Sequence, residues 1–194
     1  MADASTAKRR GRPDSATGHA LLDATERVLR AEGYGAATSR RVAQEAGVKQ
    51  QLLFYYFDSM DEMLLAAFQR RTQRGLARLQ QDLASARPLR ALWEDYSRAV
   101  DPKLTFEYMA LANHHAGIRR EVATFIRRTR RLQAERIAAV YRARGMSEAP
   151  VSPAAAAFLI GCVSLLLGRE AGSGINTGHR EVRRLVQWCL KQVE

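Results

Sequence analysis

Hydrophobic residues recur at helical spacing along almost the whole chain, and no stretch alternates hydrophobic and polar residues as a strand does. Capping residues, glycines and prolines divide this pattern into separate helices. The predicted helices cover residues 17–32, 39–46, about 49–57, 59–83, 88–100, 104–115, 118–144, 154–167 and about 178–193. The sequence therefore predicts an all-α fold, and it contains no internal repeat.

The segment that begins at Thr38 holds two short helices joined by a tight turn. Thr38 is placed to cap the first helix through its hydroxyl, and Gly47 permits the left-handed backbone that ends it. Leu53, Tyr56 and Phe57 recur at helical spacing, so we expect the second helix to bury them. The residues left with no core to face are Lys49, Gln50, Gln51, Leu52, Phe54 and Tyr55. Exposed donors, amides and aromatic rings on such a helix suit the major groove of DNA, which indicates a helix-turn-helix.

This segment and its flanks resemble the TetR family of bacterial repressors. The resemblance is carried by Ala46-Gly47-Val48, by Leu53-Phe54-Tyr55-Tyr56-Phe57 and by residues 58–64, Asp-Ser-Met-Asp-Glu-Met-Leu. It covers about a quarter of the chain, from Leu21 to Phe68. The resemblance implies an N-terminal three-helix DNA-binding domain, followed by a helical domain that binds a small-molecule effector and forms a homodimer.

Four positions depart from the family's usual pattern. Lys49 replaces the serine that caps the recognition helix, which forfeits a cap worth about 1 kcal/mol and places a cation at the positive end of the helix dipole. We therefore expect Lys49 to meet phosphate or guanine. Gln51 replaces a small residue, Phe54 replaces a tyrosine that often touches phosphate, and Met60 replaces a lysine. These differences predict a DNA site unlike those of the family's better-known members.

The candidate DNA contacts follow from this resemblance and from side-chain chemistry. Base-edge contacts are expected from Arg40, Lys49, Gln50 and Gln51. Phosphate contacts or positioning in a groove are expected from Ser39, Arg41, Tyr55, Tyr56 and the tail arginines Arg10 and Arg12. Leu52 and Phe54 complete the exposed surface of the second helix.

A basic arm precedes the first helix, with the sequence Lys8-Arg9-Arg10-Gly11-Arg12-Pro13. Its centre, Arg-Gly-Arg-Pro, resembles an AT-hook, whose narrow backbone lets arginines lie in an A·T-rich minor groove. A solvated tail without DNA contacts is an equal alternative. The predicted organisation is a disordered basic arm over 1–16, a helix-turn-helix domain over 17–62, and a helical effector-binding and dimerisation domain over 63–194.

The net charge of +11 does not by itself locate the DNA-binding surface. Residues 1–70 hold 10 basic and 9 acidic side chains, whereas residues 71–194 hold 21 and 11. The predicted DNA-binding domain is therefore nearly neutral, and the placement of single charges matters more than their sum. The arginine-rich second part keeps open an alternative function, that of a non-specific architectural DNA-binding protein. It also weakly favours an anionic effector.

The last two predicted helices indicate a dimer. Ser152 and Pro153 open a helix that is apolar nearly all round from 154 to 167, and Thr177 is placed to cap the final helix. A helix this apolar needs cover on more than one side, and the family resemblance implies a four-helix interface with a second copy. Two recognition helices about one turn of DNA apart would then read a palindromic operator. The alternative is that the two helices only complete the core of the monomer.

We expect a cytoplasmic protein with no membrane contact. The basic residues near the N-terminus are not followed by the apolar run of a signal peptide. The apolar stretch from 154 to 167 is too short to span a bilayer and is expected to form a buried helix. Cys162 and Cys189 lie in apolar helical patterns, so free core thiols are expected rather than a redox pair.

The middle helices contain aromatic and polar residues that are candidates for an effector pocket, with ordinary core packing as the alternative. The candidates are Trp93, Tyr96, Phe106, Met109, Asn113, Phe125 and Phe158. An effector bound there would favour one of two states that differ in the spacing of the recognition helices.

A catalytic or metal-binding function is the third interpretation. Glu107 and His114 share a helical face and His115 is adjacent, but no third ligand, HExxH motif or nucleophile motif accompanies them. We therefore expect no enzyme activity, no metal and no cofactor. The predicted function is a transcriptional regulator, a repressor that a small molecule releases from a palindromic operator.

Overall fold

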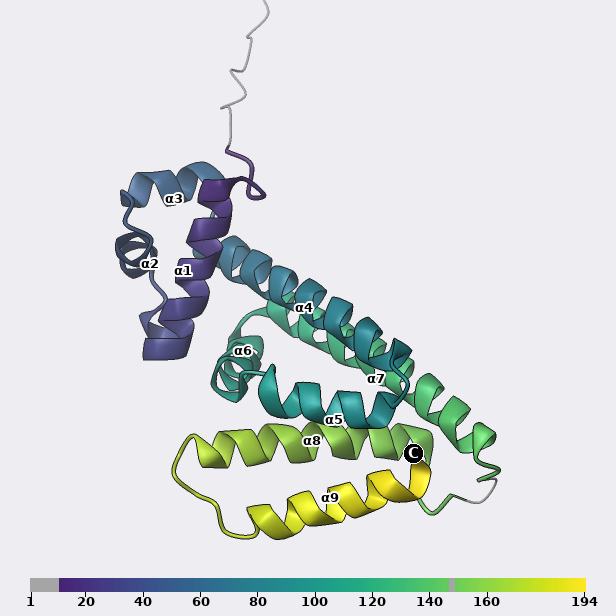
Figure 1. The fold of residues 1–194 in the computed structure, drawn as a ribbon. Coiled ribbons are helices and arrows are strands. Elements are labelled where there is room, and N and C mark those ends of the chain that lie inside the picture. The colour runs from purple at the N-terminus through teal and green to yellow at the C-terminus, as the bar shows by residue number, and fades with distance from the viewer. Residues whose placement is uncertain (1–10, 147–148) are drawn as a thin grey trace, which may run out of the picture. The chain divides into compact units, whose positions relative to one another are not determined.

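The computed structural model describes residues 11–146 and 149–194, and within them it confirms the predicted all-α fold. This part of the chain forms nine α-helices and one 310 helix, and no strand. Figure 1 labels the α-helices in chain order. The elements are α1 (Ala16–Glu32), η1 (Tyr34–Ala36), α2 (Ser39–Glu45), α3 (Gln50–Tyr56), α4 (Met60–Ala84), α5 (Pro88–Arg98), α6 (Pro102–His114), α7 (Ala116–Ala143), α8 (Pro153–Ala171) and α9 (His179–Val193). The largest difference from the predicted bounds is in α8, which continues beyond residue 167.

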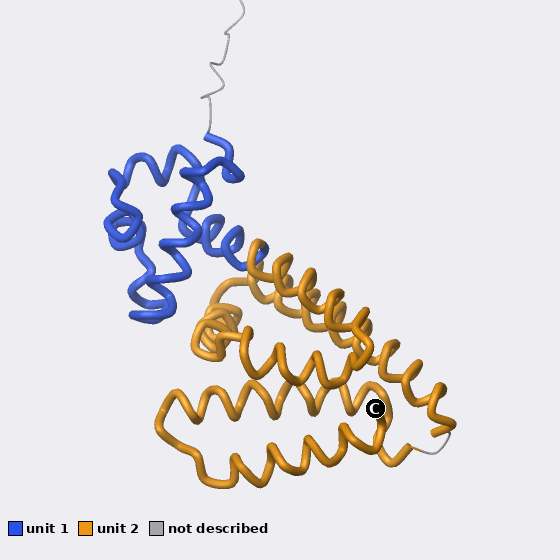
Figure 2. The backbone as a smooth tube through the Cα atoms, in the orientation of Figure 1, with its two compact units in different colours: residues 1–69 blue, residues 70–194 orange. Residues whose placement is uncertain are grey.

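The chain divides into two compact units, unit 1 over residues 1–69 and unit 2 over residues 70–194, which Figure 2 shows in different colours. The division falls inside α4, whose first turns belong to unit 1 and whose remainder belongs to unit 2. The candidate DNA-contacting residues and the candidate effector-binding residues therefore lie in different units.

Unit 1 is a small helical domain in which α2 packs against both α1 and α3. The hydroxyl of Ser15 caps α1 by accepting a hydrogen bond from the Gly18 N–H (3.1 Å). Leu29 of α1, Val42 of α2 and Leu53 of α3 are all fully buried. Helices as short as α2 and α3 are not stable alone in water, so their formation depends on this shared core.

A hydrophobic cluster that joins α5, α7, α8 and α9 forms the core of unit 2. Its buried members are Leu89, Trp93, Ile137, Ala157, Leu167 and Leu190. Along α6, Leu104, Tyr108 and Leu111 are buried. One side of α8 and one side of α9 are therefore part of the core of the single chain.

The rest of α8 is less buried than the sequence predicts. Burial on all sides is wrong, because Phe158, Leu159 and Leu166 are 47%, 48% and 53% exposed. The expectation about the bilayer also changes, since the 19-residue α8 is long and apolar enough to cross a membrane by length and composition alone. The exposed side of α8 is an apolar surface that the single chain leaves uncovered.

The start of α9 also differs from the prediction. Thr177 does not cap this helix; α9 begins at His179, and among the described residues no side chain caps its first turn. Gly178 precedes it in the left-handed conformation, with φ of 78°. Glycine adopts this conformation at low cost because it has no Cβ, which explains why the chain enters α9 through Gly178.

The side chain of Glu194, at the other end of α9, caps the N-terminus of α5. Its carboxylate accepts hydrogen bonds from the N–H groups of Leu89 (2.7 Å) and Arg90 (3.1 Å), which α5 cannot pair internally. The helix dipole favours a negative charge at this position. The main-chain oxygen of Glu194 accepts a further bond from Arg144, at the end of α7 (2.5 Å). Glu194 therefore links the ends of three helices.

The substitution Glu194→Ala tests this cap. We expect it to lower the free energy of unfolding by about 1–2 kcal/mol, because two partly buried N–H groups lose their acceptor. Thermal unfolding followed by circular dichroism measures the effect, with Gln192→Ala at an exposed position of α9 as the matched control. Equal melting temperatures for Glu194→Ala and the control would contradict the capping role.

Candidate nucleic-acid interface

The turn between α2 and α3 is built as the sequence predicts. The Thr38 hydroxyl accepts a hydrogen bond from the Arg41 N–H (3.3 Å) and caps α2. Gly47 has φ of 68°, the left-handed backbone that stops a helix. The Val48 N–H then donates to the Ala43 carbonyl (3.0 Å), which satisfies a carbonyl group near the end of α2. The chain thereby reverses into α3 within a few residues.

One side of α3 is buried and the other is exposed. Leu53 and the following Phe57 are 0% and 1% exposed, as expected, whereas Tyr56 is only half-buried. The exposed side consists of Lys49, Gln50, Gln51, Phe54 and Tyr55, with Leu52 half-buried beside them. A cation, two amides and two aromatic rings thus form one outward surface, which has the chemistry needed to contact base edges and phosphates.

Lys49 occupies the N-cap position of α3. Among the described residues, α3 has no side-chain capping hydrogen bond, which agrees with the predicted loss of the cap. The first N–H groups of α3 and the lysine ammonium are both positive, so the start of this helix is an electropositive surface. Such a surface favours contact with phosphate or with the acceptor atoms of guanine.

Two of the candidate DNA contacts are bonded to each other. The side-chain amide of Gln50 donates a hydrogen bond to the Ser39 hydroxyl oxygen (2.7 Å). This bond joins the start of α3 to the start of α2 and holds the Gln50 side chain in one orientation. A side chain that is already held loses less entropy on binding than a mobile one. Sequence reasoning selected both residues separately and missed the link between them.

Arg41 is held by an ion-pair network that sequence reasoning also missed. Its guanidinium contacts carboxylate oxygens of Glu32 (2.6 Å) and Glu45 (3.0 Å), and Arg27 contacts Glu45 from α1 (2.8 Å). The hydrogen bond from Arg27, followed by that from Arg41, lowers the pKa of the Glu45 carboxyl. The spacing of four residues between Arg41 and Glu45 was a visible signal for one of these pairs. Arg40, by contrast, is exposed.

The network predicts a pH-dependent effect of Glu45→Gln. Because the pKa of Glu45 is lower in the folded protein than its usual value of 4.5, the carboxylate stabilises the fold above that value and ceases to do so as the pH falls through the folded pKa. We therefore expect the variant to melt below the wild type at pH 7, and the difference between the two melting temperatures to shrink as the pH falls below 4.5. The control is Glu94→Gln, which removes a half-buried carboxylate of α5 that pairs with Arg98 of the same helix (3.1 Å). A difference in melting temperature that stays constant as the pH is lowered would contradict the charge-based cause.

Of the two predicted arm arginines, Arg10 lies outside the described residues. Arg12 is exposed and donates two hydrogen bonds to the Asp14 carboxylate (3.1 and 2.9 Å), which lowers the pKa of Asp14. The neighbouring Gly11 N–H donates to the Tyr55 carbonyl at the end of α3 (3.2 Å). The structure thus brings Arg12 into the same unit as the candidate contacts on α2 and α3.

The candidate effector-binding residues are distributed over α5, α6, α7 and α8. Trp93 belongs to the core cluster of unit 2, and the Tyr96 hydroxyl accepts a hydrogen bond from the buried Gln133 (2.9 Å). Burial raises the pKa of Tyr96. The guanidinium of Arg130 stacks on the exposed Phe158, 4.7 Å from the ring centre. Phe106 and Phe125 are half-buried, whereas Met109 and Asn113 are exposed. The effector pocket stays a prediction.

A polar cluster close to Tyr96 was not singled out from the sequence. Burial, and secondarily the nearby Asp95, raises the pKa of Asp82. Asp95 is paired with Arg78 of α4 (3.5 Å). Titratable groups with perturbed pKa values occur at functional sites and also in structural ion-pair networks. These residues connect α4 with α5 in the neighbourhood of two of the candidate effector-binding residues.

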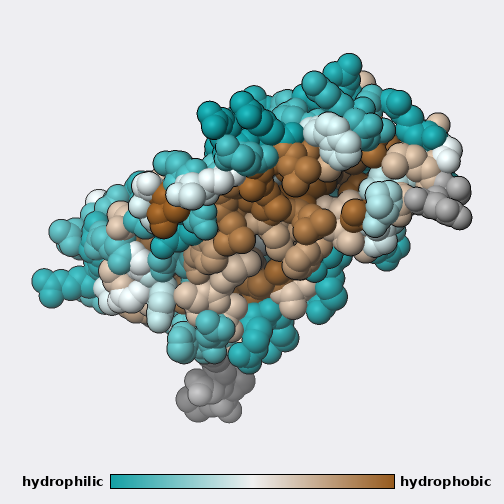
Figure 3. All heavy atoms as spheres, turned by 90° about the horizontal axis from the view of Figure 1, so that it is seen from below, coloured by the Kyte–Doolittle hydropathy of each residue, from teal (hydrophilic) through white to brown (hydrophobic). Residues whose placement is uncertain are grey.

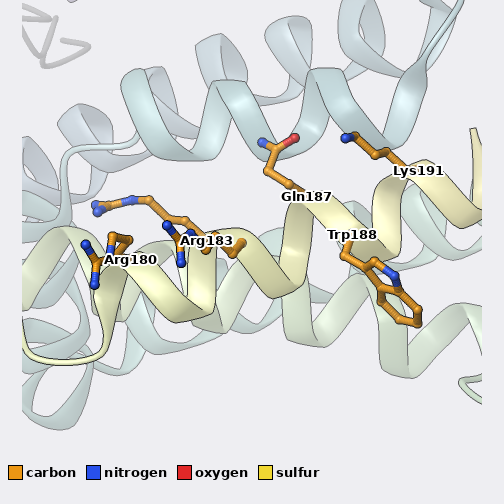
Figure 4. A pocket seen from close by; sticks show the side chains of 6 residues that line it. Arg180, Arg183, Gln187, Trp188 and Lys191 are labelled. Carbon is orange, nitrogen blue, oxygen red and sulfur yellow. The ribbon is translucent and has the colours of Figure 1, made fainter.

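A shallow groove on the outside of unit 2 follows α9, and Figure 4 shows the side chains that line it. Trp188 projects from a different side of α9 than Gln187 does. The lining residues are Arg180, Arg183, Arg184, Gln187, Trp188 and Lys191. All of them come from a single helix, so the groove is a basic surface rather than an enclosed effector pocket.

A broad hydrophobic surface covers the side of the molecule formed by α8 and α9, as Figure 3 shows. Cys189 belongs to an exposed part of α9, so its predicted place in the core is wrong, and Cys162 is half-buried. Both thiols are free. The exposed apolar residues on the two helices are Phe158, Leu159, Leu166, Leu185 and Trp188.

The metal-binding interpretation gains no support from the described residues. Among them, no group of three or more His, Cys, Asp or Glu side chains is arranged to hold a metal ion. His114 is exposed and Glu107 is half-buried on α6.

Comparison with known proteins points to one family. Residues 21–67 match the family model described as bacterial regulatory proteins, tetR family. The match spans α1 to α3 and the first part of α4, which is the region that carries the outward surface of α3. No curated protein matches the chain in sequence.

Solved structures of transcriptional regulators share the fold over most of the chain. A TetR/AcrR family member is similar with a TM-score of 0.76 and 15% identity, over 90% of this chain and 98% of that one. Salmonella enterica GusR has a TM-score of 0.71 and 16% identity, over 91% and 94%. FadR from Bacillus subtilis, solved in complex with stearoyl-CoA, has a TM-score of 0.62 and 14% identity, over 89% and 97%. At these identities the likeness shows the fold alone.

Proposed function

We propose that this chain is a TetR-family regulator and a sequence-specific repressor. Residues 21–67 match the TetR family model, and solved structures of transcriptional regulators share the fold over most of the chain. The observation that carries this proposal is the outward surface of α3. Lys49, Gln50 and Gln51 are exposed there, and the hydrogen bond to Ser39 holds the Gln50 side chain at that surface. A recognition helix needs exposed donors and amides at its start, where base edges are read.

The residues of the interface divide into two roles. Arg40, Lys49, Gln50 and Gln51 contact base edges, because their side chains can form the paired hydrogen bonds that distinguish bases in the major groove. Ser39, Tyr55 and Tyr56 contact phosphates and fix the register, with Leu52 and Phe54 packing against the groove. Arg41 reaches a phosphate from its ion-pair network, in which two carboxylates fix its position.

A titration against DNA from upstream of the protein's own gene tests the function. Fluorescence anisotropy at two salt concentrations, with excess random duplex as competitor, separates the alternatives. Tight, competitor-resistant binding supports a sequence-specific regulator, because a specific site is preferred over random DNA by several kcal/mol. If that DNA and sites selected from random sequence bind no better than competitor, a non-specific architectural function replaces the proposal.

Gln50→Ala tests the assignment of base reading to α3. We expect discrimination at one base pair to weaken by roughly 1–3 kcal/mol, while binding to random DNA changes little. Competition with a set of operator variants, each changed at one base pair, measures the loss. Gln73→Ala on the exposed side of α4 is the matched control. Unchanged discrimination among the operator variants would remove Gln50 from the base-reading set.

The exposed apolar side of α8 and α9 supports a homodimer. Leu185 and Trp188 are 60% and 61% exposed, and a contiguous apolar surface of this kind is typical of a permanent interface. A second copy is the partner whose α8 and α9 carry the same apolar surface, and a two-fold axis lets these surfaces cover each other. The two α3 helices then read half-sites about 34–36 Å apart on a palindromic operator.

Leu185→Glu tests the dimer. A carboxylate placed in an apolar interface loses its hydration without gaining a partner, so we expect the variant to be monomeric at concentrations where the wild type is dimeric. Sedimentation equilibrium or light scattering measures the mass, and Gln73→Glu on α4 controls for the added charge. A variant that remains dimeric would place the interface elsewhere.

The repressor responds to a small molecule bound in unit 2. The FadR structure, which shares the fold, contains stearoyl-CoA, and the arginine-rich unit 2 of this chain is suited to an anionic or apolar effector. The effector releases the operator by binding one of two conformations more tightly than the other. Release of labelled operator from the complex, screened with acyl thioesters and fatty acids, tests this part of the proposal. The protein acts on DNA in the cytoplasm.

A further inference from the structure

The basic arm is attached to the recognition helix at Gly11. The Gly11 N–H donates a hydrogen bond to the Tyr55 carbonyl (3.2 Å), and the rings of Tyr55 and Tyr56 lie against the glycine. The two rings meet edge to face, with centres 5.2 Å apart and an angle of 90° between their planes. The arm therefore reaches the end of α3 at a defined residue.

Only glycine fits this contact. A Cβ atom built on Gly11 would meet carbon atoms of both tyrosine rings, 2.7 Å from the Tyr55 Cε1 atom and closer still to Tyr56. Contacts this short do not occur between real side chains, so a larger residue would displace the rings or the arm. The position next to Arg12 is thus fixed by the shape of two aromatic residues at the end of α3.

The side chain of Arg12 is bonded to the Asp14 carboxylate. Its guanidinium donates to both carboxylate oxygens, at 3.1 and 2.9 Å, and the two side chains are 83% and 64% exposed. A pair of planar groups with two parallel hydrogen bonds has the geometry in which arginine also binds phosphate. An exposed pair of this kind contributes little to stability, so a phosphate can replace the carboxylate.

We propose that Gly11 seats the arm on α3 so that Arg12 contacts a DNA phosphate, with the Asp14 carboxylate holding the guanidinium until the phosphate replaces it. This inference rests on the proposed binding of duplex DNA through α3. The N-terminal residues of a recognition helix contact base edges, and in the homeodomain variant of the motif the C-terminal end of that helix contacts the DNA backbone. Gly11 and Arg12 are attached at that end, beside Tyr55 and Tyr56.

The contact differs from the minor-groove contact suggested by the Arg-Gly-Arg-Pro sequence. An AT-hook requires a glycine whose backbone can lie along the groove floor, and here Gly11 is engaged by two tyrosine rings. A phosphate contact is independent of base sequence, whereas a minor-groove contact depends on A·T content. The two outcomes can therefore be separated by the flanking sequence of the DNA.

The experiment measures the salt dependence of DNA binding for the full chain. Affinity is titrated between 50 and 200 mM salt against three duplexes: the operator with A·T-rich flanks, the operator with G·C-rich flanks, and random sequence. The variants are Arg12→Ala, Gly11→Ala and Asp14→Asn. The matched controls are Arg142→Ala, an exposed arginine of α7, and Gly35→Ala, where a Cβ meets no atom within 4 Å. Thermal unfolding of each variant checks that the fold is retained.

One lost phosphate contact reduces the slope of log K against log salt by about 0.9. We expect this reduction for Arg12→Ala on all three duplexes, with affinity weakened roughly three- to tenfold. Gly11→Ala produces the same reduction although Arg12 is retained, and the double variant is no worse than either single one. Asp14→Asn tightens binding by about two- to fivefold, because the competing carboxylate is gone. Neither control changes the slope by this amount.

Two results overturn the inference. An effect of Arg12→Ala that is confined to the A·T-rich flank assigns the arginine to the minor groove. An unchanged slope for Arg12→Ala or for Gly11→Ala removes the seated phosphate contact. If the wild type binds all three duplexes equally, the sequence-specific function is contradicted, but the phosphate contact of Arg12 is not. The slope of log K against log salt on random duplex then still tests that contact.

Discussion

The packing of α3 through Leu53 and Phe57 is the constraint on which the recognition surface depends. A helix of seven residues has too few internal hydrogen bonds to persist alone, so these two buried side chains and the turn at Gly47 hold it. Gln50, Gln51, Phe54 and Tyr55 then stay exposed on the outward side of the helix. Within unit 1, the hydrogen bond from Gln50 to Ser39 joins α3 to α2, and the ion-pair network around Arg41 joins α2 to α1.

The sequence predicted the elements whose signals are local. Thr38, Gly47 and Ser152 act on neighbouring residues, and each was recognised from the residues that follow or precede it. The contacts that were missed join distant residues. Neither the cap that Glu194 provides to α5 nor the contact of Gly11 with Tyr55 has a periodic signal, because each depends on how the chain folds back. Thr177 is not the cap because α9 begins one residue later than predicted, so that Gly178 occupies the cap position.

The hydrophobicity of α8 predicted that other helices bury it. It did not predict whether those helices belong to the same chain or to a second copy. Ala157 and Leu167 face the core of unit 2, whereas Phe158 and Leu166 remain exposed. An apolar residue in a monomer core and an apolar residue in an interface have the same side-chain chemistry, so only the fold separates the two groups. The same ambiguity applies to the aromatic residues of α5 to α7, which is why the sequence could propose an effector pocket without locating it.

Glu194 links two helices of unit 2. It follows α9, the helix that carries Leu185 and Trp188, and its carboxylate accepts hydrogen bonds from the first N–H groups of α5, the helix that carries Trp93 and Tyr96. If α5 moved along its axis by one turn, about 5.4 Å, both hydrogen bonds would break or α9 would have to follow. The helix that carries two of the candidate effector-binding residues is thereby linked to the helix with the exposed apolar side, through this side chain as well as through the core cluster.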